Sequence, residues 1–232
     1  MYGGGFFNFY GSSWLIFLLP AILFAGYAQM KISSTFDKYL KVASNTGMNG
    51  AQIARYILDR NGLNNVTVEH VKGNLTDHYD PRSKVVRLSD NVYRGSSIAA
   101  MSVAAHEVGH AMQHAEGYYP LIIRNNIAPI ASFGSRLVGI FIIIGLVIDS
   151  LSLINFGIVL FLAAVLFQVI TLPVEFNASK KALVQLEDGI SSRENLKPAK
   201  KVLNAAALTY VAATLVAVAQ LLRLLSLANR RR

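Results

Sequence analysis

Two histidines and a glutamate in the motif HEVGH, residues 106–110, are the side chains of this sequence best placed to do chemistry. Residues four apart lie on one face of an α-helix, so His106 and His110 can reach one zinc ion. Glu107 borders that face, where its carboxylate can take a proton from zinc-bound water. Zinc lowers the pKa of such water toward about 7, which makes it a nucleophile at neutral pH. The motif therefore predicts a zinc hydrolase with Glu107 as its general base.

A catalytic zinc held by two histidines needs a third protein ligand and an open position. The chain has no cysteine, so the third ligand must be a histidine or a carboxylate. His114 is unsuitable, because three residues on consecutive turns of a straight helix spread over about 12 Å. Our prediction is Glu175, just past Pro173, because an apolar run before it can return it to the level of the HEVGH helix. Asp188 and Glu187 are the alternatives.

Long apolar runs place this site in a membrane protein. Hydrophobic residues make up 53% of the chain and charged residues only 15%, which does not suit a purely soluble protein. The runs at 130–148 and 151–172 form a predicted helical hairpin that turns at Asp149-Ser150. With the first and last runs they make four predicted transmembrane helices, at residues 14–30, 130–148, 151–172 and 202–225. The lipid bilayer is therefore one expected partner.

The polar region after the first span is predicted to contain helices and a small sheet. A helix is predicted over residues 33–60. Residues 66–71 and 84–89 are predicted strands, joined as a hairpin or meander through a turn at 77–83. The edge of the second strand could add an extended peptide, although an ordinary place in the sheet suits it better. Ser96-Ser97 offers an N-cap to a helix that carries HEVGH. The expected fold class is α+β, mainly helical and integral to the membrane, with a small β-sheet next to the active-site helix.

These elements divide the chain into five segments. We predict an N-terminal span, a zinc-peptidase domain, a transmembrane hairpin, a third-ligand segment and a C-terminal span with a basic tail, at residues 1–30, 31–130, 131–174, 175–201 and 202–232. Lysines and arginines are frequent in the second and fourth segments, which the positive-inside rule places in the cytoplasm. We expect a multi-pass protein of the cell membrane with a cytoplasmic active site. The net charge of +9 suits anionic headgroups, and no recognition motif for nucleic acid accompanies it.

Two other functions use the same residues. A non-catalytic, metal-binding membrane scaffold would be favoured by a degenerate motif, but every position of HExxH is present. A site-2-type intramembrane protease would take Asp188 of an Asp-Gly pair as third ligand. The apolar stretch before His106 covers only residues 98–105, which is too short to span a bilayer. Peptide hydrolysis also needs a donor for the developing oxyanion, for which the candidates are His78, Tyr79, Tyr118, Tyr119 and Arg193.

The order of HEVGH, two apolar runs and then EFNAS resembles the gluzincin membrane peptidases of the HtpX and CAAX prenyl endopeptidase type. Those enzymes take their third ligand from Glu-x-x-x-Asp; Glu175 matches the Glu, while Ser179 stands at the Asp position. The segments DHYDPRSKVVRLSDNVY, AAHEVGHAMQHAEGY and LPVEFNASKKAL are similar to the YugP-like neutral zinc metallopeptidases, apart from Asn177 where many members have Asp. This resemblance implies hydrolysis of peptide or protein substrates, membrane proteins among them, with Zn2+ on His106, His110 and Glu175. It also implies a short sheet before the active-site helix.

Overall fold

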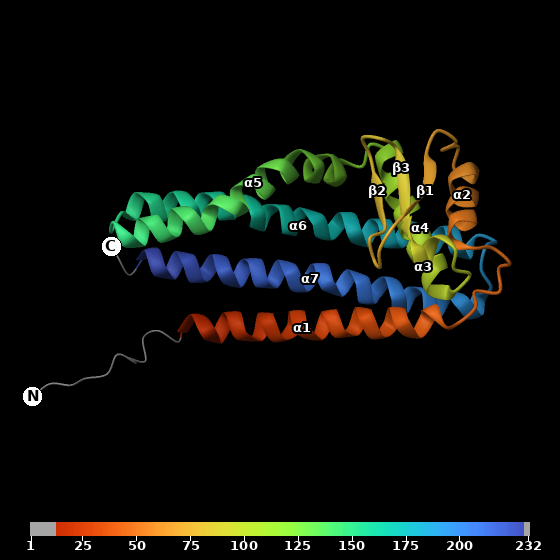
Figure 1. Ribbon diagram of the computed structural model, residues 1–232, viewed down its shortest axis with the longest axis horizontal. Helices are drawn as coiled ribbons and strands as arrows, with labels where there is room; N and C mark the ends of the chain where they lie inside the picture. The colour runs from red at the N-terminus through yellow and green to blue at the C-terminus, as the bar shows by residue number, and fades with distance from the viewer. Residues whose placement is uncertain (1–12, 230–232) are drawn as a thin grey trace, which may run out of the picture. The chain divides into compact units, whose positions relative to one another are not determined.

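The computed structural model describes residues 13–229, with side chains from Phe17 onward, and this part of the chain is mostly helical (Figure 1). Its elements are α1 (Ser13–Leu40), α2 (Gly50–Arg60), β1 (Thr67–Val71), β2 (His78–Asp80), β3 (Val85–Ser89), α3 (Asp90–Tyr93), α4 (Ile98–Ala115), α5 (Tyr119–Val147), α6 (Leu151–Glu187) and α7 (Arg193–Asn229). Contacts divide it into two compact units. The mixed unit, residues 28–124 and 170–210, contains the sheet and HEVGH; the helical unit contains the rest.

The three strands of the sheet lie in the order β1-β3-β2. β3 pairs with β1 in parallel, Thr67 opposite Val85, and with β2 in antiparallel orientation, Tyr79 opposite Val86. The two predicted strands are present, but the predicted hairpin or meander is wrong, because β1 and β3 run parallel and β2 lies on the far side of β3. The connection between β1 and β3 is long enough to carry the chain back, and it contains β2 where a turn was predicted. The prediction that the edge of β3 could pair with an extended peptide is also wrong, because β3 is the central strand.

The predicted helix over residues 33–60 is divided in two. α1 ends at Leu40 and α2 begins at Gly50, where Asn49 and Gln52 cap the new helix reciprocally. Between them, Asn45 and Gly47 adopt positive φ, which a continuous right-handed helix does not permit. The interruption frees α2 to turn its apolar face toward α4 and the sheet.

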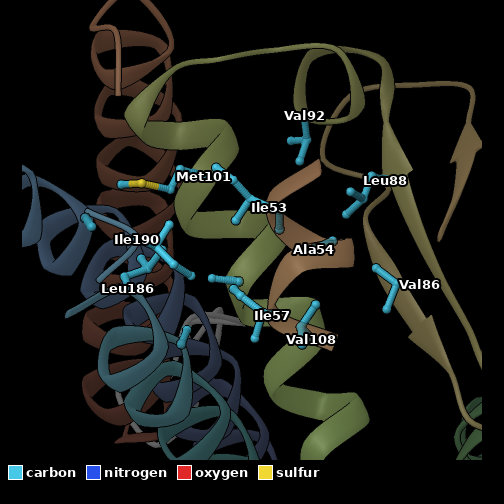
Figure 2. Close-up of a cluster of buried hydrophobic side chains, with 14 of the residues drawn as sticks. Ile53, Ala54, Ile57, Val86, Leu88, Val92, Met101, Val108, Leu186 and Ile190 are labelled. Atoms are coloured by element: carbon cyan, nitrogen blue, oxygen red, sulfur yellow. The ribbon is translucent and has the colours of Figure 1, made fainter. Parts of the chain in front are cut away.

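The core of the mixed unit lies between α2, α4, β3 and the end of α6. Figure 2 shows Ile53, Ala54 and Ile57 of α2 among side chains of these elements. As predicted, Ser97 is the N-cap of α4: its hydroxyl accepts a hydrogen bond from the Ala100 N–H at 3.1 Å. Behind HEVGH, α4 buries mostly small residues, which permits close packing on neighbouring helices: Ala99, Ala100, Ala104, Ala105 and Ala111. This packing fixes the helix that carries the motif.

Among the described residues, three helices are long and apolar enough to cross a membrane: α5, α6 and α7. The prediction of four spans is therefore wrong by one. The run at 14–30 is helical within α1, but its described part soon meets Gln29, Lys31 and Ser33, and this lowers the hydropathy. In the helical unit, α5 and α6 form the predicted hairpin, with Asp149 at positive φ in the turn. α6 continues past its predicted end at 172, so that Glu175 lies on the same helix.

Candidate metal site

Helices α4 and α6 bring three metal-ligating side chains to one point in the mixed unit. His106 and His110 lie on one face of α4, with their ring centroids 4.8 Å apart. The Oε2 atom of Glu175, on α6, lies 3.2 Å from His106 Nε2 and 3.5 Å from His110 Nε2. The ligand atoms of the three residues all lie within 4.8 Å of one another. In the part of the chain that the structure describes, this is the one group of its kind that could hold a metal ion.

The donors fit zinc in kind and in spacing. Zinc binds imidazole nitrogen and carboxylate oxygen at about 2.0–2.2 Å in tetrahedral geometry, and this separates neighbouring ligand atoms by about 3.3–3.6 Å. The two Nε2–Oε2 distances, 3.2 and 3.5 Å, agree with this requirement. Glu175 is 2% exposed and His110 9% exposed, so bulk water is largely excluded. Three protein ligands leave a fourth position for water or substrate, as a catalytic site needs.

A glycine allows α6 to approach α4 closely enough for Glu175 to reach the histidines. An ideal Cβ on Gly109 would lie 2.6 Å from the carbonyl oxygen of Ala178, far closer than an ordinary contact. Ala178 follows Glu175 by three residues, so the two lie on the same face of α6. Gly109 therefore helps to position the third predicted ligand, although it has no side chain to offer the ion.

The second nitrogen of each histidine is also in contact with a polar group. His106 Nδ1 lies 3.2 Å from the Ser179 hydroxyl, and His110 Nδ1 lies 3.0 Å from Gln113 Oε1. Ser179 stands where HtpX-type peptidases have Asp, and the serine hydroxyl reaches the histidine ring from that position. A partner on Nδ1 orients an imidazole and leaves its Nε2 to face the metal. Both Nε2 atoms lie toward Glu175 here.

Glu107 lines a cavity of about 320 Å³ together with His106. Much of the remaining lining is apolar and comes from α1, α4 and α7: Ile32, Phe36, Val103, Val202, Leu203 and Ala206. Burial raises the pKa of the Glu107 carboxyl to about 7, while the charge of His106 acts to lower it and that of Glu175 to raise it. A carboxyl group with a pKa near neutrality can both take up and return a proton.

The alternative third ligands lie outside the three-residue group. Asp188 pairs with Arg60, whose Nη2 lies 2.7 Å from Asp188 Oδ2. His114 Nδ1 lies 2.8 Å from the Tyr79 hydroxyl, one turn beyond His110 on α4. Glu187 is the last residue of α6 and is not in the group either. The structure thus brings Glu175 to the histidines and leaves the other candidates elsewhere.

The oxyanion donors considered from the sequence do not line the cavity beside Glu107. Tyr79 contacts His114, the Tyr118 hydroxyl lies 3.5 Å from the Pro173 carbonyl oxygen, and Tyr119 is 71% exposed. The cavity is instead lined by Tyr210 of α7, which sequence reasoning missed. The feature of the sequence that could have indicated Tyr210 is the presence of a tyrosine within a predicted membrane span.

Arg124, near the start of α5, is a second residue that sequence reasoning missed. Its Nη2 atom lies 4.0 Å from Oε1 of Glu175, the carboxylate oxygen that does not face the histidines. The positive charge balances part of the charge of a carboxylate that is 2% exposed. In the sequence, Arg124 is an isolated basic residue 51 positions before Glu175, and nothing in its neighbourhood marks this role.

Comparison with known proteins shows the family of the chain. A family model described as "Putative neutral zinc metallopeptidase" matches residues 14–229. A protein of Bacillus subtilis (strain 168) named "Putative membrane protease YugP" is 52% identical over 210 residues, which are 90% of this chain and 93% of that protein. No solved structure matches the chain. The family model covers the helices that carry His106, His110 and Glu175, and zinc is the metal in its description. The family resemblance seen in the sequence is confirmed: the chain belongs to the family described as "Putative neutral zinc metallopeptidase".

Proposed function

We propose that this protein is a membrane-bound zinc metalloendopeptidase, in which His106, His110 and Glu175 hold Zn2+ and Glu107 is the general base. The proposal is carried by one observation, the convergence of two imidazole nitrogens and a carboxylate oxygen within 4.8 Å of one another, with both nitrogen–oxygen distances at tetrahedral spacing. Zn2+ held there would acidify water and polarise the carbonyl of a peptide bond. The geometry supports this set over one with Asp188, which is paired with Arg60.

Glu107 would move the protons of the reaction. Its carboxylate takes a proton from the attacking water and later delivers it to the amine that leaves when the peptide bond breaks. The residue adjoins His106 on α4 and lines the cavity, so it lies beside the ligands without belonging to their group. Tyr210, which lines the same cavity, is our candidate to donate a hydrogen bond to the oxyanion that develops on the peptide carbonyl.

The cavity and the sheet both favour an extended peptide as substrate. The apolar lining from Val103, Leu203 and Ala206 suits an apolar side chain next to the scissile bond. β2 is an edge strand of the sheet and contacts α4. An extended substrate can add to such an edge through main-chain hydrogen bonds, which leaves side-chain pockets to set specificity.

We further propose that the site faces the cytoplasm of a multi-pass protein. Three apolar helices suit a membrane, and the chain is similar to a protein named as a membrane protease. The mixed unit carries lysines on both of its polar segments, as the positive-inside rule requires of a cytoplasmic face. Glu175 and HEVGH lie in this one unit, so the proposed ligands need not cross the bilayer to meet.

The decisive variant is Glu107→Gln, assayed in detergent on an unfolded protein substrate. We expect it to lose hydrolysis while it binds zinc as the wild type does, because the amide cannot accept the proton. Glu116→Gln is the matched control, since Glu116 is the C-cap residue of α4 and an exposed partner of Lys181 of α6. Full hydrolysis by Glu107→Gln would reject the general base, and wild-type protein without hydrolytic activity or zinc would reject the proposed function.

A further inference from the structure

Gln113 is a buried polar residue whose side chain connects His110 to α6. It lies on α4, three residues after His110, and its exposed fraction is 0%. Its Oε1 atom lies 3.0 Å from His110 Nδ1. Its Nε2 atom donates to the Val174 carbonyl oxygen at 2.8 Å and to Asn177 Oδ1 at 2.9 Å. The carboxamide therefore has a partner for its oxygen and two for its nitrogen.

These contacts determine which way the Gln113 amide faces. A main-chain carbonyl can only accept a hydrogen bond, so the group that approaches the Val174 oxygen must be the NH2 of the amide. The amide oxygen is then the atom that faces His110, and this oxygen can only accept. His110 must consequently carry a proton on Nδ1, so that in the neutral ring Nε2 holds the lone pair.

We infer that Gln113 is a positioning residue that holds His110 in the tautomer able to bind a metal. The inference rests on the proposed zinc site, because the freed Nε2 is the atom 3.5 Å from Glu175 Oε2. Val174 and Asn177 lie on either side of Glu175 on α6. The Gln113 amide therefore connects the main chain next to Glu175 to the imidazole ring of His110. Removing the amide would release the ring and leave the Val174 carbonyl without this partner.

The other histidine has no such partner on Nδ1 and is restrained through Nε2 instead. His106 Nδ1 faces the hydroxyl of Ser179, which can rotate to donate or to accept. The structure therefore predicts an asymmetry in the metal-free protein. Gln113 holds the proton of His110 on Nδ1 in advance, whereas the Glu175 carboxylate, 3.2 Å from His106 Nε2, can only accept and therefore holds the proton of His106 on Nε2 until a metal displaces it.

The test measures histidine tautomers by nitrogen NMR in metal-free protein, together with zinc affinity by chelator competition. We expect wild-type His110 to carry its proton on Nδ1, and Gln113→Met, which keeps the length of the side chain, to give a mixture of tautomers. Zinc affinity should fall about 10- to 100-fold, the usual effect of removing a partner of a ligating histidine. Ser102→Ala is the matched control, because Ser102 is a fully buried polar residue of α4 whose hydroxyl donates to the Ile98 carbonyl oxygen of its own helix.

A second variant, Asn177→Leu, tests the same link from α6 without altering α4. It removes one of two acceptors from the Gln113 NH2, so we expect a smaller loss of zinc affinity than for Gln113→Met. An unchanged His110 tautomer and unchanged affinity in Gln113→Met would overturn the inference, as would an equal loss in Ser102→Ala. If the wild type bound no zinc, the proposed function would fail, yet the tautomer in metal-free protein would still decide the role of Gln113.

A separate observation concerns a cavity of about 610 Å³ between α1 and α7, away from the metal site. Its lining includes Lys31 and Lys38 of α1 and Lys201 of α7, together with Thr35. Within the described residues, none of these lysines forms an ion pair, and the lining contains no carboxylate. Lys38 Nζ lies 5.6 Å from the centroid of the Tyr39 ring, a contact that leaves its charge in place. Three lysines without an ion pair around one hollow favour an anionic ligand.

The position of these lysines along their helices indicates the source of the anion. Lys31 is the first charged residue after the long apolar part of α1, and Lys201 is the last one before the long apolar run of α7. The cavity continues into that run through Ala205 and Leu208. The boundary of a bilayer has the same order, with phosphate at the level of the basic residues and acyl chain beyond it. We propose that this cavity binds the headgroup of an anionic phospholipid.

The test compares lipids retained by purified protein in native mass spectrometry, from mixed phosphatidylglycerol and phosphatidylcholine. We expect the wild type to retain phosphatidylglycerol preferentially and a Lys31→Gln, Lys38→Gln, Lys201→Gln variant to lose this preference. The matched control removes the same charge from exposed lysines outside the lining: Lys72→Gln, Lys84→Gln and Lys200→Gln. Equal loss in the control would overturn the site. Displacement of the lipid by millimolar inorganic phosphate would show a phosphate site and overturn the lipid assignment.

Discussion

Gly109→Ala should weaken zinc binding although residue 109 is not a predicted ligand. The new Cβ would lie 2.6 Å from the Ala178 carbonyl oxygen and 3.2 Å from its Cα and C atoms, all of them main chain. Moving the closest contact from 2.6 Å to an ordinary 3.4 Å requires that α4 and α6 separate by about 0.8 Å. Metal–ligand distances tolerate only about 0.2 Å. Glu175 lies three residues before Ala178 and would be carried away from His106 and His110.

Stability and zinc affinity should respond differently to this change. The clash costs about 1–3 kcal/mol as overpacking, while replacing a helical glycine by alanine recovers about 1 kcal/mol. We therefore expect a small change in the free energy of unfolding beside a loss of zinc affinity of tenfold or more, measured by chelator competition. Gly139→Ala is the control, because a Cβ there meets nothing within 4 Å. If Gly109→Ala bound zinc as tightly as the wild type, the argument that close packing delivers Glu175 would be refuted.

Three further predictions follow from the ligand set, the cavity and the sidedness. Asp188→Asn should bind zinc like the wild type, because that carboxylate pairs with Arg60; loss of metal would favour the intramembrane mechanism. Ala206→Phe fills the cavity, so it should lower kcat/KM about tenfold or more at unchanged zinc content. Since the chain has no cysteine, Lys72→Cys and Ser192→Cys can be probed in intact cells with an impermeant thiol reagent. Both should be shielded while Ser150→Cys is labelled, and labelling of both would invert the topology.

The three-residue group that we propose as the metal site was predictable from the sequence to the extent that its geometry is local. HEVGH fixes the spacing of two imidazoles on one helix, and the N-cap at Ser97 marks where that helix begins. Glu175 was predicted as the third ligand because an apolar hairpin can return the chain to the level of the HEVGH helix. Gln113 and Tyr210 were missed because their roles depend on contacts between helices that are far apart in the sequence.

The sheet was harder to predict because strand patterns do not encode the direction of pairing. Val85 to Ser89 would alternate in the same way in a parallel or an antiparallel sheet, and residues 72–84 had no strand pattern strong enough to reveal β2. The break between α1 and α2 did have a local signal, in the glycine and asparagine residues of 45–50. Reading residues 33–60 as one helix overlooked the positive φ that such residues adopt.

The central claim is that His106, His110 and Glu175 hold one zinc ion, and X-ray absorption at the zinc edge of the purified protein tests it most directly. We expect one zinc per chain, surrounded by two imidazole nitrogens at about 2.0–2.1 Å and light oxygen ligands at about 2.0–2.2 Å. Glu175→Gln should lower the zinc affinity and change the shell of oxygen ligands relative to the wild type, whose spectrum contains both histidines. A protein without stoichiometric zinc, or a spectrum that Glu175→Gln leaves unchanged at full occupancy, would contradict the claim.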